Sequence, residues 1–210
     1  IGQFPSGGVP YFVFAFAGQL AWMLFAGTLS KSSICLVGNA HLVSKIYFPR
    51  LVLPLSTVLG VLLDVGVALV MLVVMLALFH ITPSIGILLL PVWAVLVLMI
   101  ALGLGLFAAA LTVTYRDIQY VLPVFLQLMM YASPVAYQLD FAVQKMGGNL
   151  KWFFYANPLS GLLEAFRWSL LGVGSLNTGL LTYSVVFAFV IFAFGAFSFR
   201  RMERRFADVI

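Results

Sequence analysis

Few side chains in this sequence could act as acids, bases, nucleophiles or metal ligands. The 210 residues include six Asp or Glu, two His and one Cys, and the single Cys35 excludes an intrachain disulfide and a thiolate metal cluster. Asp117 stands beside Arg116, and neither Asp140 nor Glu164 has an acidic or His residue close by in the sequence. Because an enzyme needs positioned acids or bases, this pattern argues against covalent chemistry in the chain.

Asp64 is the acidic residue that lies well inside a long apolar run. An ionisable group inside a membrane span is expensive and is by default a functional hypothesis. The alternative is that Asp64 stays protonated or bonds a neighbouring helix, and so only fixes packing. Gln19 and Gln127 are candidate partners of Asp64 or candidate lining of a substrate path. Both could equally join helices by hydrogen bonds.

Aromatic residues form a second group of candidates. Sugar rings expose C–H faces that pack on aromatic faces, so Trp22, Phe25, Tyr131 and Tyr137 are candidates to line a path for a glycan. The alternative for each residue is a place in the aromatic belt of the membrane interface. Trp22 lies deeper in its apolar run than a belt residue should, which favours the path for this residue.

The composition indicates that membrane-spanning helices must position these side chains. The sequence is 64% hydrophobic and 8% charged, with a mean hydropathy of +1.15, whereas a soluble domain carries about 25% charged residues. We therefore expect an all-α polytopic membrane protein with residues 1–210 in a single transmembrane domain. The net charge of +5 does not indicate nucleic-acid binding, because the basic residues sit at the ends of apolar runs.

Five apolar runs are predicted to be transmembrane helices, at about 11–29, 55–78, 85–113, 120–137 and 179–199. Lys31 is expected to close the first span, and Ser133-Pro134 to kink or break the fourth near its far end. Within the third span Ala101, Gly105 and Ala109 recur every four residues. Small residues at this spacing let helices approach closely, within a subunit or across a dimer.

Residues 138–176 are predicted to hold a short helix rather than a span. Asn157 is a suitable cap, Pro158 suits the first helical position, and Gly172 is a stop signal. The helix carries Glu164 and Arg167, so it is too short and too charged to cross. We expect it to be interfacial or re-entrant.

The stretch between the first two runs is predicted to form a short amphipathic helix at the membrane surface. Asn39 can cap it, and Pro49 stops it before Arg50. His41 and Lys45 share one helical face. The other face is apolar and comprises Leu42, Val43, Ile46 and Tyr47. Either the basic residues only snorkel at the interface, or the helix presents a rigid surface to a cytoplasmic partner.

The basic residues predict the orientation. With the C-terminus in the cytoplasm, eight of the eleven Lys and Arg residues lie inside and three outside, in agreement with the positive-inside rule. Five spans then leave the N-terminus outside. Ile1 is not an initiator Met, and residues 2–10 have the composition of a loop. We expect the chain to be N-terminally incomplete, without one span.

Five motifs follow one another along the chain: PSGGVPY (5–11), LVGNAHLVSKIYFPRLVLP (36–54), YRDI (115–118), SPV (133–135) and NPL (157–159). In this order they resemble the permease subunits of ABC-2 type exporters, in the branch that exports polysaccharides such as O-antigen, teichoic acid and capsule. The motif at 36–54 is the most specific. The resemblance implies six spans per subunit, and a homodimer of permeases with two ATPase subunits.

The resemblance also implies that residues 39–48 are the coupling helix that docks into the ATPase. The coupling residues that follow from it are Asn39, His41, Ser44, Lys45, Tyr47, Phe48, Arg50, Arg116 and Asp117. The sequence contains no Gly-x-x-x-x-Gly-Lys-Ser/Thr motif, so no cofactor is expected on this chain. ATP and Mg²⁺ are expected on the partner ATPase.

We therefore expect this chain to be the transmembrane subunit of an ATP-driven exporter that moves a lipid-linked polysaccharide across the bacterial inner membrane. It should contact membrane lipid and bind no nucleic acid. Two alternatives stay open. One is an ABC-2 exporter of drugs or other small hydrophobic molecules. The other is a membrane-embedded transferase that acts on polyprenyl-linked sugars.

Overall fold

The computed structural model describes residues 8–41, 49–139, 141, 143, 151–174 and 176–203. In these ranges four helical segments are long and apolar enough to cross a membrane. They are α1 (Tyr11–Gly38), α3 (Val52–Leu78), the 3₁₀ helix η1 (Ile85–Leu89) with α4 (Leu90–Thr114), and α9 (Thr178–Glu203). Three helices are shorter: α5 (Ile118–Ala132), α7 (Lys151–Ala156) and α8 (Pro158–Leu171). The predicted all-α polytopic fold is confirmed, although α7 was not predicted.

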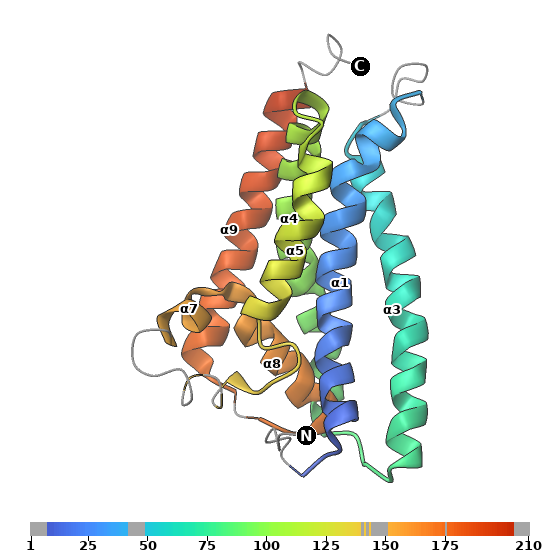
Figure 1. Cartoon of the computed structure of the whole chain (residues 1–210), viewed down its shortest axis with the longest axis vertical. Coiled ribbons are helices and arrows are strands. Elements are labelled where there is room, and N and C mark those ends of the chain that lie inside the picture. Colours follow the sequence, from blue (N-terminus) through green and yellow to red (C-terminus); the bar gives the residue numbers. More distant parts are fainter. Residues whose placement is uncertain are drawn as a thin grey trace.

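The long helices run side by side as one bundle (Figure 1). α4 packs against α9 and α1, and α3 packs mainly against α1 at the edge of the bundle. α1 and α9 end, and α3 and α5 begin, at one end of the bundle. We call it the basic end, after Arg50, Arg116, Arg200 and Arg201. The first turn of α1 lies at the opposite, far end, as the predicted topology requires.

α1 is longer than predicted, because it continues past Lys31 to Gly38. The helix itself therefore extends beyond the predicted close of the span at Lys31. Ser32 Oγ donates to the Thr28 carbonyl at 2.6 Å, and Ser33 Oγ donates to the Ser30 carbonyl at 2.8 Å. Because these hydroxyl groups are satisfied within the helix, the polar stretch does not interrupt it.

α5 is shorter than the predicted run 120–137. Ser133 has an extended backbone, with φ −105° and ψ 145°, as the residue before a proline favours. The break predicted at Ser133-Pro134 is confirmed. The 15 residues of α5 rise about 22 Å, which is less than the hydrocarbon core of roughly 30 Å. α5 ends beside α8, which occupies the far end of the bundle (Figure 1).

α8 begins and ends where the sequence predicts. Asn157 Oδ1 accepts a bond from the Leu159 N–H at 3.0 Å, and Gly172 ends the helix in the left-handed conformation, with φ 68°. α8 packs against α1, α4 and α9, and most of its side chains are buried. It is separate from α9, so the prediction that it does not continue into a span is confirmed.

Small residues set the spacing of the helices around α4. A methyl group added to Gly105 would overlap Ser32 Oγ of α1, and Ala101 and Ala109 are both buried. On the other side of α4, a methyl group added to Gly195 of α9 would overlap the carbonyl oxygen of Gly103. The two backbones therefore approach each other through glycine.

We expect Gly195→Ala to destabilise the folded chain by about 1–3 kcal/mol, because overpacking forces the two backbones apart. Gly66→Ala on α3 is the matched control, since nothing lies within 4 Å of the added Cβ, and it should change the stability by less than about 1 kcal/mol. Thermal unfolding in detergent micelles measures both. Equal midpoints for the two variants would contradict the close approach of α4 and α9.

Candidate functional site

The predicted coupling residues that the structure describes lie at the basic end. They belong to two connections there, the one between α1 and α3 and the one between α4 and α5 (Figure 1): Asn39, His41, Arg50, Arg116 and Asp117. Arg116 and Asp117 are both exposed. Ser44, Lys45, Tyr47 and Phe48 lie outside the described residues, as does most of the predicted amphipathic helix. Their part of the prediction stays a prediction.

Asn39 closes α1. Its Nδ2 donates to the Cys35 carbonyl at 2.8 Å, and its backbone N–H donates to the carbonyls of Cys35 and Leu36. The sequence predicted Asn39 to be the N-cap of the following helix. In the structure, the hydrogen bonds of Asn39 are to carbonyls of α1, the preceding helix. The sequence could not distinguish the two, since an Asn between helices suits either end.

Arg50 joins the start of α3 to the end of α9. Its Nη1 donates to the Glu203 carbonyl at 2.9 Å, across 153 residues of sequence. Glu203 is the last residue of α9 that the structure describes, and a backbone carbonyl oxygen has two lone pairs with which to accept from a guanidinium group. The segment 42–48 thus follows Asn39, which is fixed on α1, and precedes Arg50, which is fixed on α9.

Asp64 pairs with Lys31 of α1. Lys31 Nζ lies 2.8 Å from Asp64 Oδ2, and the two side chains are 47% and 50% exposed. The partner is therefore neither Gln19 nor Gln127, the residues considered from the sequence. The sequence did not suggest this pair, because Lys31 was expected at the close of the first span and Asp64 well inside the second.

The candidate path residues lie on different surfaces. Trp22 and Phe25 are buried inside the bundle, with their ring centroids 5.4 Å apart. Gln127 and Tyr131 are exposed on α5, and Gln19 is exposed on α1. The sixth candidate, Tyr137, donates from its hydroxyl to the Tyr131 carbonyl at 2.9 Å. The structure does not bring the six together, and their place on a substrate path stays a prediction.

Arg167 is the residue that the sequence analysis missed. It is 2% exposed, although it was counted among the basic residues outside the membrane. Its Nη2 donates to the carbonyls of Pro134 at 2.6 Å and Val135 at 3.1 Å, and its Nη1 donates to that of Tyr137 at 3.3 Å. The guanidinium carbon also lies 4.0 Å from the centre of the Phe14 ring of α1.

The helical period contained a signal for this burial. Leu163 and Leu170 stand four residues before and three residues after Arg167, so all three share one face of α8. Because that face is the apolar stripe, an arginine on it must be buried. A buried guanidinium group needs several acceptors, and the broken end of α5 supplies carbonyls that no helix uses.

Two further bonds hold the same junction. Asn157 Nδ2 donates to Ser133 Oγ at 2.8 Å, and Glu164 Oε1 accepts from the Leu139 N–H at 3.2 Å. We call residues 133–139 with Asn157, Glu164 and Arg167 the α5–α8 corner. The motifs at 133–135 and 157–159, distant in sequence, meet in it.

Comparisons with known proteins agree with this architecture. The family model described as "ABC-2 type transporter" matches residues 2–171, a range that contains both the coupling segment and the α5–α8 corner. The chain is 26% identical over 204 residues to "O-antigen export system permease protein RfbA" of Klebsiella pneumoniae, which covers 95% of the chain and 76% of the relative. A protein of the same name in Myxococcus xanthus is 28% identical over 154 residues, or 73% of the chain and 58% of the relative.

Proposed function

The chain belongs to the ABC-2 type transporter family, and on that premise we propose that it is the membrane-spanning subunit of an ATP-driven exporter of a lipid-linked polysaccharide. The observation that carries the proposal is similarity to O-antigen export permeases over 95% of the chain. The apolar bundle and the exposed polar connections at the basic end are consistent with it. The exporter would lie in a bacterial inner membrane.

The energy source would be a separate ATPase subunit, because the sequence has no Gly-x-x-x-x-Gly-Lys-Ser/Thr motif for nucleotide phosphates. ATP and Mg²⁺ would bind there. The basic end is the surface suited to that partner. A second copy of the chain would complete the membrane part of the exporter, as the resemblance to the family implies. The assembly would contain two permease and two ATPase subunits.

The coupling would use the fixed points of the segment 42–48. Closure of the ATPase dimer on ATP would move this segment as a body. Since Asn39 is bonded to α1 and Arg50 to the end of α9, one displacement would reach two spans of the bundle. The bundle would then shift between conformations that differ in affinity for the glycan.

Deletion of the gene for this chain tests the proposal. We expect the polysaccharide to be lost from the cell surface and the lipid-linked glycan to accumulate inside, with both effects reversed by complementation. The ATPase should co-purify with the tagged chain. Normal surface polysaccharide together with raised drug sensitivity would favour the small-molecule exporter, and sugar transfer by the purified chain without ATPase would favour the transferase.

A further inference from the structure

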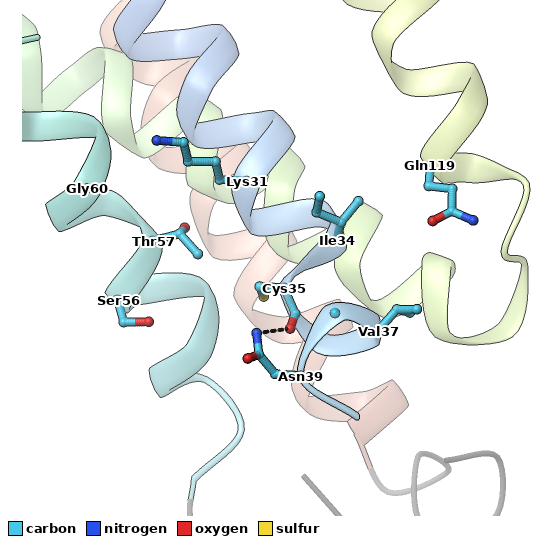
Figure 2. Close-up of a pocket in the computed structure, with 10 residues that line it drawn as sticks. Lys31, Ile34, Cys35, Val37, Asn39, Ser56, Thr57, Gly60 and Gln119 are labelled. Atoms are coloured by element: carbon cyan, nitrogen blue, oxygen red, sulfur yellow. Dashed lines mark hydrogen bonds between the residues drawn. The ribbon is translucent and has the colours of Figure 1, made fainter. Parts of the chain in front are cut away.

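A cavity of about 480 Å³ lies near the basic end, between α1, α3 and the start of α5. Figure 2 shows the side chains around it, with Lys31 on α1, Thr57 on α3 and Gln119 on α5. Lys31 lines the cavity, and its partner Asp64 lies one helical turn beyond Gly60 along α3. Asp64 stands twelve residues after Val52 and fourteen before Leu78, so it is close to the centre of α3.

This ion pair is in an environment that lipid does not provide. Charged side chains at the depth of the hydrocarbon core face either protein or a water-filled space, because hydrocarbon solvates neither charge. Lys31 and Asp64 each leave about half of the side chain uncovered, at 47% and 50%. The face of α1 and α3 that carries them is therefore suited to an aqueous path that opens at the basic end.

The lining of the cavity combines polar groups with apolar surface. The polar side chains come from all three helices and from the end of α1: Lys31, Asn39, Ser56, Thr57 and Gln119. Ile34, Val37 and Gly60 supply apolar contacts between them. Amides and hydroxyls both donate and accept hydrogen bonds, and the ammonium group of Lys31 adds a strong donor.

The charge balance selects between two parts of a lipid-linked glycan. A pyrophosphate group needs positive charge in excess, but the charge of Lys31 is already balanced by Asp64 at 2.8 Å. A sugar needs donors and acceptors for its hydroxyls and apolar surface for its C–H faces, and the cavity offers both. A neutral sugar unit therefore fits these residues better than a phosphate.

We infer that this cavity binds neutral, hydroxylated sugar units of the exported glycan as they enter from the basic end. The inference rests on the proposed function, since it names the part of the substrate that the chain contacts. Lys31 and Gln119 would bond the hydroxyls, and Ile34 and Val37 would lie against the ring.

A thiol placed in the cavity tests the inference. The chain has one cysteine, Cys35, so the double variant Cys35→Ser, Ile34→Cys carries a single thiol on the lining. Serine at position 35 keeps a donor for the Ser32 carbonyl, which Cys35 Sγ bonds in the native chain. The matched control is Cys35→Ser, Leu63→Cys, because Leu63 is 72% exposed on α3 and outside the cavity.

Both variants are reconstituted in nanodiscs with the ATPase and treated with a membrane-impermeant methanethiosulfonate. We expect the thiol of Ile34→Cys to react and that of Leu63→Cys, in contact with lipid, to stay unmodified. The neutral oligosaccharide that mild acid releases from the producing cell's lipid-linked glycan should slow the reaction about tenfold at ten times its Kd. Inorganic pyrophosphate should not slow it. Gln119→Leu should raise the oligosaccharide concentration that halves the reaction rate about threefold to tenfold, because one hydrogen bond to the sugar is lost.

An unreactive thiol in Ile34→Cys would show that protein or lipid, and not water, fills the cavity, and would overturn the inference. So would a reaction that the oligosaccharide leaves unchanged, or one that only pyrophosphate slows. A strain that lacks the gene but keeps its surface polysaccharide would instead overturn the proposed function. If the deletion strain establishes export but the oligosaccharide does not protect the thiol, only the inference about the cavity is overturned.

Discussion

Ser44→Pro is expected to abolish glycan export while the chain still inserts into the membrane. A proline inside a helix costs about 3 kcal/mol, because it removes a backbone donor and clashes with the preceding turn. Position 44 lies in the middle of the predicted coupling helix, between Asn39 and Pro49. The four long spans do not include it, so membrane insertion should not change. The measurements are surface polysaccharide and the amount of ATPase that co-purifies.

Two variants of the same segment separate helix geometry from side-chain chemistry. Ser44→Ala keeps the helix and should export normally. Lys45→Ala removes a charge at the rim of the docking surface and should weaken ATPase binding by only about 0.2–1 kcal/mol. Full ATPase recovery and normal export with Ser44→Pro would show that the segment is only an interfacial anchor.

Local signals in the sequence predicted local structure well. The cap at Asn157, the stop at Gly172 and the break before Pro134 depend on the backbone of a few neighbouring residues, and the structure has all three. These elements follow from properties that each residue carries into any fold, such as a missing N–H or a permitted positive φ.

Contacts between helices could not be predicted from such local signals. Lys31 and Asp64 are 33 residues apart, and the pair forms because α1 and α3 pack side by side with these two residues facing each other. Arg50 and Glu203 are 153 residues apart. Hydropathy identifies which runs are spans but leaves open the rotation of each helix about its axis. That rotation decides which polar residues meet, and packing against neighbours sets it.

The aromatic candidates also show that residue type does not predict which way a side chain faces. Chemical type made Trp22 and Phe25 candidates to line a path, yet both point into the interior of the bundle in this conformation. Lys31, Thr57 and Gln119, which were not candidates for the path, line the cavity near the basic end instead. Residue type alone cannot separate the two, since an aromatic ring suits a core as well as a sugar.

Arg167→Met is expected to lower the free energy of unfolding by about 3–5 kcal/mol, because each buried carbonyl left without a donor costs about 1–3 kcal/mol. Methionine keeps much of the volume but offers no N–H to Pro134, Val135 or Tyr137. The stability of Arg167→Lys should lie between those of the native chain and Arg167→Met, since one ammonium group cannot span three carbonyls as the planar guanidinium does. Arg200→Met is the control on an exposed arginine and should change the stability by less than about 0.5 kcal/mol.

A second variant shows whether the loss arises in the α5–α8 corner. A methyl group added to Gly18 of α1 would overlap the Val135 carbonyl oxygen and lie 2.8 Å from Arg167 Nη2. Gly18→Ala should therefore disrupt the contacts that Arg167→Met removes. Since residues of one network do not act independently, the double variant should lose clearly less than the sum of the single losses. Thermal or chemical unfolding of the four chains measures this coupling, and strictly additive losses would mean that Arg167 does not hold the corner against α1.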